Sequence, residues 1–495
     1  MSKKFYITTP IYYSNDVPHV GHAYSSFIAD TLASYKKLEG YDVKFTTGVD
    51  ENSQKVVEKA EEKNMPIMEY TDFMAAKHRE VWDKSSVAYT DFVRTTDKKH
   101  HDFVQKVLQK SFDNGDIYEG VYNGLYCVGC EGFKKESDLI NGKCPDHPNK
   151  EIQHLSEKNY FFKLSKYQDR LLDFYSKNPD FVKPRSKFNE IIEFVKGGLE
   201  DFSVSRETNK FGIPLPFDNS QVTYVWYDAL FNYMTYCQED AEKWWPADIH
   251  VIGKDIIRFH GIFWPAMLWS AGYDAPHQLL VTGYLTLDGQ KISKSLGNGI
   301  NPAEYIEEYS RDMLILYLFT TFPIGEDGDF SQEQATLMFN AKLSNNLGNL
   351  LNRAIALALK IDGSINGISS DIGSDKITKY SEYMSDSDLK NALEIVFEYA
   401  SEINKYVDEN APWKMDINLP EEKEKLENIL FILLSNLRKI AIMLIPFFPV
   451  KMHELLNRVG VPYDSIITLG ENLSLNPDKF FIAEKGEPLY MRISK

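Results

Sequence analysis

Two histidines near the beginning of the chain have a type and spacing that suit phosphate chemistry. His19 and His22 flank Val20-Gly21 where a predicted strand, a loop and a predicted helix meet, so both rings would lie on one face of the helix N-terminus. The partial positive charge of that N-terminus, and a glycine that lets a nucleotide approach the backbone, favour an α-phosphate that gains charge. Taken alone, a histidine pair at this spacing is more often an incidental surface pair than a site.

A second segment with suitable chemistry is Lys291-Ile292-Ser293-Lys294-Ser295, which places two lysines three positions apart with hydroxyl groups nearby. Such a loop can clamp a triphosphate, although an isolated segment of this kind is interpreted first as an exposed turn. The chain contains neither GxxxxGK[ST] nor GxGxxG, so phosphate binding must use other groups. The two segments together, in this order, are more informative than either alone.

A third set forms a CxxC segment followed by a CxxH segment: Cys127, Cys130, Cys144 and His147. Three thiolates and an imidazole match the ligands of tetrahedral zinc, and Gly129, Gly142 and Pro145 favour tight turns around them. The chain has four cysteines in 495 residues, which is a poor basis for disulfides and typical of a reducing compartment. The sequence therefore predicts a closed, structural zinc site, and a small buried residue at Cys237.

Hydrophobic periodicity predicts the elements that position these residues: strands at 4–9, 41–47, 221–225 and 250–253, and helices at 23–38 and 52–63. Strands that alternate with helices indicate βαβ units and a parallel sheet. The Gly-rich, cysteine-bearing stretch interrupts this pattern, so we interpret it as an insertion into a split domain. From about residue 342 onward the periodicity is helical.

We therefore expect an α/β fold: a split doubly wound parallel-sheet (Rossmann-type) catalytic domain, a zinc-knuckle insertion and a C-terminal α-helical bundle domain. The expected divisions are the first half of the catalytic domain at 1–117, the insertion at 118–223, the second half at 224–275, a linking region with the KISKS loop at 276–341, and the helical domain at 342–495.

Composition limits the possible functions. The net charge of −17 argues against indiscriminate nucleic-acid binding, but it allows a local basic track on an acidic body that binds tRNA by shape. No apolar run is long enough to cross a bilayer, and a polar segment follows the first residues too soon for a secretion signal. We expect a cytoplasmic protein that does not use the membrane.

The HxGH and KxSKS segments resemble the HIGH and KMSKS signatures of class I aminoacyl-tRNA synthetases, with isoleucine replacing methionine in the second. Further segments resemble those of methionyl-tRNA synthetases, in the same order along the chain: 48–52 (GVDEN), 225–230 (VWYDAL), 252–255 (IGKD), 259–266 (FHGIFWPA), 346–350 (NLGNL) and 411–413 (APW). In the first of these, Asn52-Ser53 replaces the usual His-Gly of the family. The zinc ligand set also resembles the single knuckle of many members.

The resemblance implies a ligase that activates L-methionine with ATP-Mg²⁺ to methionyl-adenylate. It would then transfer the methionyl group to the 3′ end of tRNA(Met), with release of AMP and pyrophosphate. Such a reaction depends on positioning and electrostatics more than on covalent catalysis. The implied catalytic residues are His19, His22, Lys291 and Lys294, and the implied ATP-binding residues are His19, Gly21, His22, Gly253, Asp255, Lys291 and Lys294.

The methionine-binding residues that the resemblance implies are Ile11, Tyr13, Asp50, Trp226, Ala229, Tyr233, His260 and Trp264. Asp50 would bind the α-ammonium group, aromatic side chains would surround the thioether, and a tyrosine hydroxyl would hydrogen-bond the sulfur. Each aromatic residue alone is explained as well by core packing, and Gly253 with Asp255 by a helix-entry turn.

The implied anticodon-binding residues are Asn349, Arg353 and Trp413. Trp413 could stack on an unpaired base, and Arg353 could read a base edge or a phosphate. A helix surface pair at Asn349 and Arg353, and a packing anchor at Trp413, are the simpler interpretations. The end of the chain soon after the helical part favours a monomer.

Three alternatives stay open at this point. HxGH nucleotidylyltransferases bind ATP on a related fold, but they do not explain the zinc segment, the lysine loop and the helical tail together. A non-enzymatic tRNA-binding module would not need His19, His22 and Lys294. A cysteinyl enzyme normally places zinc beside its substrate thiol, whereas here the cysteine cluster lies in the insertion. The insertion is also too small for the editing domain that the isoleucine, valine and leucine enzymes carry there.

Overall fold

The computed structural model describes residues 3–127, 132–134, 136–145, 148–207, 211–287, 289–291, 299–361, 364–367, 372–461, 468–474, 479–482 and 485–494. The chain forms two compact units. The sheet unit contains Tyr6–Ser26 and Lys44–Thr282, and the helical unit contains Met1–Phe5, Phe27–Val43 and Gly283–Lys495.

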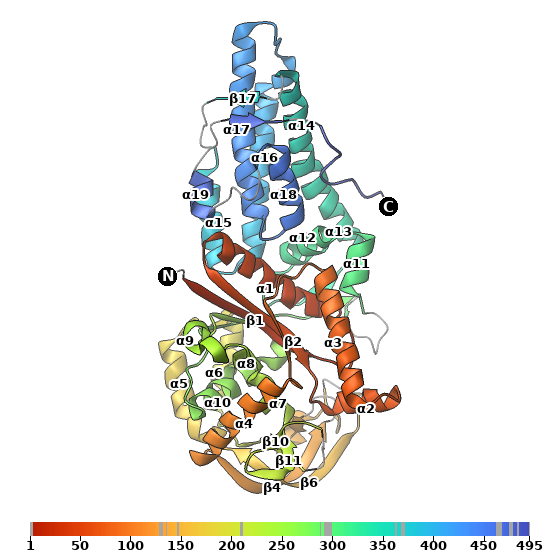
Figure 1. Ribbon diagram of the computed structural model, residues 1–495, viewed down its shortest axis with the longest axis vertical. Coiled ribbons are helices and arrows are strands. Elements are labelled where there is room, and N and C mark those ends of the chain that lie inside the picture. Colours follow the sequence, from red (N-terminus) through yellow and green to blue (C-terminus); the bar gives the residue numbers. More distant parts are fainter. Residues whose placement is uncertain are drawn as a thin grey trace. The chain divides into compact units, whose positions relative to one another are not determined.

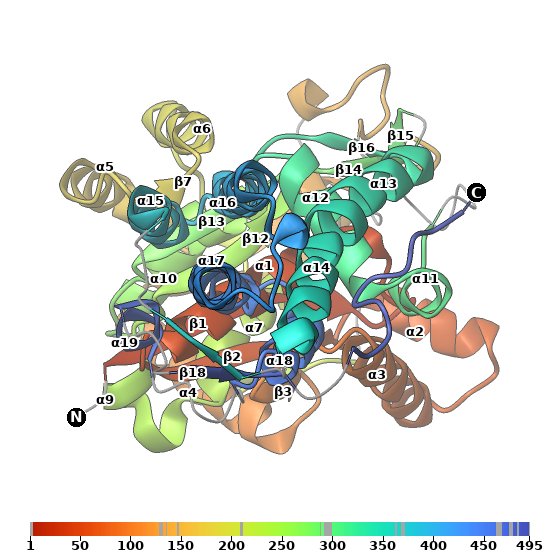
Figure 2. The ribbon, with the colours of Figure 1, turned by 90° about the horizontal axis from the view of Figure 1, so that it is seen from above.

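A six-stranded sheet is the centre of the sheet unit, in the order β3-β2-β1-β12-β13-β7. Strands β1 and β2 are labelled in Figure 1, and all six strands are labelled in Figure 2. Its strands are β1 (Lys4–Tyr13), β2 (Asp42–Asp50), β3 (Asp91–Arg94), β7 (Val182–Lys183), β12 (Ile249–Gly253) and β13 (Gln278–Thr282). The pairs β2–β3, β1–β12, β12–β13 and β13–β7 are all parallel, which confirms the predicted parallel sheet. After β1 the chain adds strands first on one side and later on the other, so a topological switch point lies between β1 and β12.

The helices of the sheet unit that matter for the site are α1 (Val20–Leu38, which continues into the helical unit), α2 (Gln54–Glu62), α3 (Ile67–Lys84), α4 (Lys98–Asp113), α5 (Gln168–Lys177), α6 (Arg185–Lys196), α7 (Val225–Leu230), α8 (Asn232–Thr235), α9 (Ala241–Trp244) and α10 (Trp264–Ser270). The helix predicted at 23–38 begins three residues earlier, at Val20, directly after His19. The strand predicted at 4–9 continues to Tyr13, because Pro10 starts no turn and the strand stays extended through it.

The cysteine-bearing stretch contains a long antiparallel ribbon of β4 (Ile117–Cys127) and β6 (Ile152–Phe162), flanked by β5 (Gly132–Lys134) and β8 (Phe202–Ser203). The segment predicted as a strand at 221–225 is β11 (Asp218–Thr223). It pairs antiparallel with β9 (Ser205–Arg206) and β10 (Pro214–Leu215) in a separate three-stranded sheet. The short strand β7, which falls between residues 118 and 223, joins the edge of the parallel sheet.

The helical unit confirms the helical period of the C-terminal part. Its main helices are α12 (Arg311–Thr321), α13 (Gln332–Phe339), the π-helix η7 (Asn340–Gly348), α14 (Asn349–Ala358), α15 (Ser374–Ser385), α16 (Leu389–Asn410), α17 (Pro420–Leu444) and α18 (Pro449–Arg458). Helices α14, α16 and α17 pack together and are seen nearly end-on in Figure 2. Among the described residues, no helix has the length and apolar character that a membrane span requires.

Candidate active site

The two histidines of the HxGH segment lie at the start of α1, immediately after the loop that follows β1. Their rings are stacked with centroids 3.9 Å apart. The backbone N–H of Gly21 donates to Nδ1 of His19 at 3.1 Å, and the backbone N–H of His19 donates to Nδ1 of His22 at 3.3 Å. Because each Nδ1 accepts, each neutral ring must carry its proton on Nε2. Both histidines therefore present an N–H donor beside a helix N-terminus, which suits a phosphate oxygen.

Gly21 is needed for this arrangement. A Cβ atom at this position would lie 2.9 Å from Cε1 and 3.0 Å from Nδ1 of His19. The ring of His19 would have to move, and its bond from the Gly21 N–H would be disturbed. The glycine is thus explained by the packing of a histidine, in addition to the backbone approach that the sequence suggested.

Asp50 is the last residue of β2 and is buried. The loop after β1 is tied to it, because the N–H and hydroxyl of Ser14 both donate to the Asp50 carbonyl, at 3.0 and 3.2 Å. Its carboxylate accepts from the backbone N–H of Asn52 at 3.3 Å. The carboxyl end of β2 thus holds a fixed carboxylate beside the switch point, where ligands bind in open α/β sheets.

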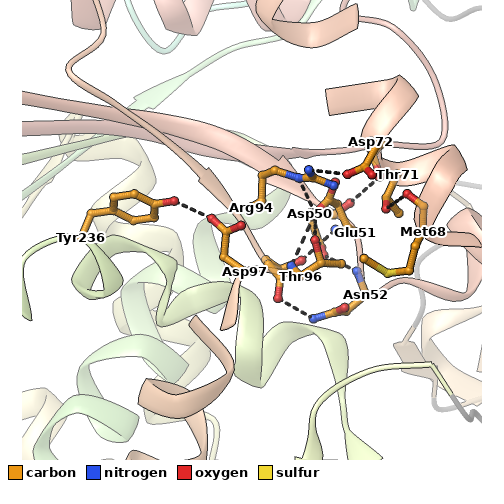
Figure 3. Close-up of polar contacts among 12 residues, drawn as sticks. Asp50, Glu51, Asn52, Met68, Thr71, Asp72, Arg94, Thr96, Asp97 and Tyr236 are labelled. Carbon is orange, nitrogen blue, oxygen red and sulfur yellow. Dashed lines mark hydrogen bonds and ion pairs between the residues drawn. The ribbon is translucent and has the colours of Figure 1, made fainter. Parts of the chain in front are cut away.

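Glu51, the next residue, forms a buried ion pair that anchors this loop (Figure 3). Arg94 at the end of β3 donates to its carboxylate from Nε at 3.0 Å, and its Nη2 lies 2.9 Å from Oε1 of the same carboxylate in an ion pair. The Thr96 hydroxyl donates to this carboxylate as well. Arg94 also contacts Asp72 of α3 at 2.6 Å. Burial raises the pKa of Glu51, and the bonds from Arg94 and Thr96 oppose that shift. These contacts assign Glu51 a structural role.

The two residues that depart from the family pattern both have partners. Ser53 is the N-cap of α2, and its hydroxyl accepts from the N–H of Val56 at 3.3 Å. The side-chain amide of Asn52 donates to the Thr95 carbonyl at 3.2 Å and to Oδ2 of Asp228 at 3.0 Å. The departure therefore supplies a helix cap and a link to α7.

Five of the predicted methionine-binding residues lie on four helical elements. Trp226 and Ala229 lie on α7, Tyr233 on α8, His260 on the π-helix η5 (Phe259–Phe263) and Trp264 at the start of α10. All except Trp226 are buried. Trp226 is half-buried and stacks on Phe259, with ring centroids 3.8 Å apart and planes 4° from parallel. Its Nε1 has no hydrogen-bond partner among the described residues. Ile11 and Tyr13 lie at the carboxyl end of β1, the strand next to β12.

Tyr233 and His260 form a hydrogen-bonded pair. The hydroxyl of Tyr233 is 2.6 Å from Nε2 of His260, whose Nδ1 lies 3.0 Å from the Ile256 carbonyl. A carbonyl can only accept, so Nδ1 carries the ring proton and Nε2 accepts from Tyr233. Burial lowers the pKa of His260 to about 4, which keeps it neutral. In this arrangement the hydroxyl proton of Tyr233 is already donated, so a methionine sulfur would have to compete for it.

His250 on β12 contacts two of these predicted side chains, Tyr233 and Trp264, and was not predicted from the sequence. Its Nε2 accepts from the indole N–H of Trp264 at 3.3 Å, its Nδ1 lies 2.7 Å from the Thr8 hydroxyl, and its ring stacks on Tyr233 with centroids 4.3 Å apart. Burial holds the pKa of His250 well below its ordinary value. Its position in an apolar strand just before Gly253 was the available signal.

The predicted ribose-binding pair lies at the end of β12. Gly253 is the last residue of that strand, and Asp255 is exposed in the 3₁₀ turn that follows. A Cβ on Gly253 would lie 2.6 Å from Oδ1 of Asp255, so the glycine lets this carboxylate fold back against the strand end. Gly253, Asp50 and Tyr13 thus end three neighbouring strands.

The lysine loop is described in part. Lys291 belongs to β15 (Gln290–Lys291), which pairs with β14 (Leu285–Leu287) in the helical unit. Lys294 lies outside the described residues. Its approach to the histidines is therefore a prediction.

The predicted zinc ligands are also described in part, because Cys130 and His147 lie outside the described residues. Cys127 ends β4 and is buried, as is Cys144, although residues 141–143 and 145 around Cys144 are exposed. Asn141 and Gly142 have φ of 52° and 75° between the paired residues Ile140 and Lys143, a two-residue hairpin turn just before Cys144. Cys237 is buried, as predicted, with its Sγ 3.6 Å from the Tyr233 carbonyl.

The predicted anticodon residues lie on the helical unit. Asn349 is exposed at the start of α14, and Arg353 follows one turn later. Arg353 pairs with Asp408 of α16 at 2.6 Å, and its guanidinium lies 5.2 Å from the ring centroid of Trp413. The Trp413 side chain is 44% exposed, so it is no core anchor. A groove that includes Asp408 is lined by Ala341, Asn345, Asn346, Ser401, Asn404, Lys405, Asp408 and Glu409.

Comparison with known proteins identifies the family. The family described as tRNA synthetases class I (M) matches residues 5–155 and 148–355. A methionine–tRNA ligase of Caldanaerobacter subterraneus is 42% identical, over 100% of this chain and 79% of its own length, and one of Rickettsia felis is 42% identical over 93% of each. The Mycobacterium tuberculosis methionyl-tRNA synthetase in complex with methionyl-adenylate superposes with a TM-score of 0.93 at 31% identity, covering 99% of this chain and 100% of that one. The chain belongs to the methionyl-tRNA synthetase family, within the class I aminoacyl-tRNA synthetases.

Proposed function

We propose that the pocket at the switch point of the sheet unit carries out the reaction of this family. The chain is a ligase that activates L-methionine with ATP to methionyl-adenylate and transfers the methionyl group to the 3′ end of tRNA(Met), with release of AMP and pyrophosphate. The observation that supports this site most strongly is the placement of its parts on three neighbouring strands: Asp50 ends β2, and the stacked histidines follow β1. Tyr233 of the Tyr233–His260 pair stacks on His250 of β12.

Methionine recognition would start from the buried carboxylate of Asp50, which suits the α-ammonium group as a charge-assisted acceptor. The aromatic walls of Trp226, Tyr233 and Trp264 suit a flexible thioether, at about 0.3–1.5 kcal/mol for each sulfur–aromatic contact. Ile11, Tyr13 and Ala229 would complete the pocket. Leucine has a similar volume but no polarisable sulfur, so these contacts favour methionine.

The chemical step is an in-line attack of the methionine carboxylate on the α-phosphate of ATP, which enters with its Mg²⁺. The Nε2–H groups of His19 and His22 would donate to phosphate oxygens, and the α1 N-terminus would add positive potential. Gly253 and Asp255 would hold the ribose. Lys291 and Lys294 would stabilise the pentavalent state and the departing pyrophosphate, since little covalent work is asked of the protein.

The cysteine-bearing ribbon fits a structural zinc ion. Cys127 and Cys144 are both withdrawn from solvent, although neighbouring residues of Cys144 are exposed. With Cys130 and His147 they give the three thiolates and one imidazole of a closed tetrahedral site, which would hold the ribbon together and take no part in the reaction.

The helical unit would bind the anticodon through Asn349, Arg353 and Trp413. An exposed tryptophan beside a guanidinium offers a stacking face and base-edge donors to an unpaired base. We further propose that the protein is cytoplasmic and works as a monomer. Light scattering of the purified protein would check the oligomeric state.

The decisive experiment is ATP–pyrophosphate exchange with each of the twenty amino acids. We expect exchange with methionine and little with leucine or cysteine. Exchange with leucine or cysteine but not with methionine would overturn the assignment of substrate.

A further inference from the structure

Asn52 connects the predicted ammonium-binding residue to a wall of the methionine pocket. It is buried just after the end of β2, where its backbone N–H donates to Oδ1 of Asp50 at 3.3 Å (Figure 3). Its side-chain amide donates to the Thr95 carbonyl at 3.2 Å and to Oδ2 of Asp228 at 3.0 Å. One residue thus joins the ends of β2 and β3 to helix α7.

Asp228 lies between Trp226 and Ala229 on α7 and has no exposed surface. The Thr223 hydroxyl donates to the same Oδ2 at 3.3 Å. A buried carboxylate depends on its donors, and a hydrogen bond that involves a charged group is stronger than one between neutral groups. The position of α7 relative to Asp50 therefore depends on the Asn52 amide.

We infer that Asn52 is a positioning residue for methionine. Its side chain sets the distance between Asp50 and the predicted methionine-binding residues of α7, Trp226 and Ala229, and so determines methionine affinity. This inference rests on the proposed function. It also explains the Asn-Ser departure, because an amide N–H can make the donation to Asp228 that an imidazole N–H could make at the same place.

The groups around Asn52 make the inference testable by charge. Asn52 donates to the Asp50 carboxylate at the end of β2, to the Asp228 carboxylate on α7 and to the Thr95 carbonyl just after β3. All three partners are therefore acceptors. Buried His100 on α4 is held neutral, with its pKa lowered to about 3 by burial, and Glu51 is paired with Arg94. A carboxylate introduced at position 52 would thus face the carboxylates of Asp50 and Asp228 and the Thr95 carbonyl.

The experiment measures kcat and KM for methionine and for ATP in ATP–pyrophosphate exchange by the full chain. For Asn52→Ala we expect kcat/KM for methionine to fall by about 10-fold to 100-fold, while KM for ATP changes by less than about twofold. In Asn52→Asp, kcat/KM for methionine should fall further at high pH. It should recover as the pH is lowered, because the introduced carboxyl group and a carboxylate that it faces then share a proton. Asn52→His should restore part of the loss.

Asn178→Ala is the matched control, because it also removes an amide-to-carbonyl bond (to Phe174, 2.8 Å) but at the end of α5, which carries none of the predicted methionine-binding residues. Wild-type protein that shows no methionine-dependent exchange would contradict the proposed function itself. Active wild-type protein with equal losses for methionine and ATP in Asn52→Ala, or with no pH-dependent recovery in Asn52→Asp, would overturn the inference. If Asn52→Ala fails to fold, Asn52→His and Asn52→Asp still decide it.

Discussion

At the scale of single residues, the candidate site works by fixing protons and rotamers. Backbone N–H groups determine which nitrogen of His19 and His22 is protonated, and the Ile256 carbonyl does the same for His260. None of these proton positions depends on a contact with the substrate. The site is therefore largely set before ligands arrive, as electrostatic preorganisation requires.

The close contact between Gly21 and His19 gives a prediction at this scale. Gly21→Ala should lower the rate of methionine-dependent exchange by about tenfold or more, because a Cβ 2.9 Å from Cε1 would displace the His19 ring. Gly470→Ala is a suitable control, since a Cβ there meets nothing within 4 Å. Equal rates in wild-type protein and Gly21→Ala, at unchanged thermal stability, would show that the ring position does not matter.

The buried histidines predict how stability depends on pH. Burial lowers the pKa of His260 to about 4 and of His100 to about 3, from an ordinary value of 6.5, and it lowers that of His250 as well. Below 6.5 the unfolded chain binds protons that the folded chain does not. The free energy of unfolding should therefore decrease as the pH is lowered from 6.5 to about 4, by up to about 1.4 kcal/mol per pH unit for each histidine.

Urea unfolding at several pH values tests this prediction. His260→Gln should retain part of the pH dependence but with a smaller slope, since one of the three groups no longer titrates. A free energy of unfolding that stays constant from neutral pH to about pH 5 would refute the assignment of neutral, buried histidines.

At the scale of elements, the sequence predicted the parts with strong periodicity and missed those decided by long-range pairing. The helix starting near the HxGH segment and the strands at its sides were predicted within a few residues. The segment at 221–225 was read as sheet-like, but periodicity could not show that β11 pairs with β9 and β10 in a sheet of its own. Tertiary contacts decide such pairings.

The site shows the same division. Motif positions were enough to collect Trp226, Tyr233 and His260 near one another, whereas the support from His250 and the link from Asn52 to Asp228 depend on contacts between distant segments. The competition for the Tyr233 hydroxyl proton depends on the tautomer of His260, which the Ile256 carbonyl fixes and no motif records.

The cysteine-bearing ribbon gives a prediction for an element. Cys144→Ser should abolish bound zinc, because a neutral hydroxyl replaces one of four ligands. Metal analysis of the purified protein measures the stoichiometry, and Cys237→Ser, at a buried cysteine outside the ligand set, is the control. Zinc retained at wild-type stoichiometry in Cys144→Ser would contradict the predicted knuckle.

At the scale of the whole molecule, the chain forms two compact units: the sheet unit carries the proposed activation site and the helical unit the predicted anticodon residues. Trp413→Ala should therefore slow tRNA charging while leaving exchange unchanged. The loss of a base-stacking contact of about 1–3 kcal/mol corresponds to roughly 5-fold to 150-fold in kcat/KM for tRNA. Trp413→Phe should keep most of the activity, and a parallel loss of exchange in Trp413→Ala would argue against separate roles.

The central claim is that the HxGH histidines and the lysine loop act on the same nucleotide, although Lys294 comes from a segment far along the chain. The most direct test is the rate of methionine-dependent ATP–pyrophosphate exchange in Lys294→Ala compared with wild-type protein. We predict a loss of about 10²–10³ in rate, with methionine binding in the absence of ATP unchanged. A rate in Lys294→Ala equal to that of wild-type protein would contradict the account.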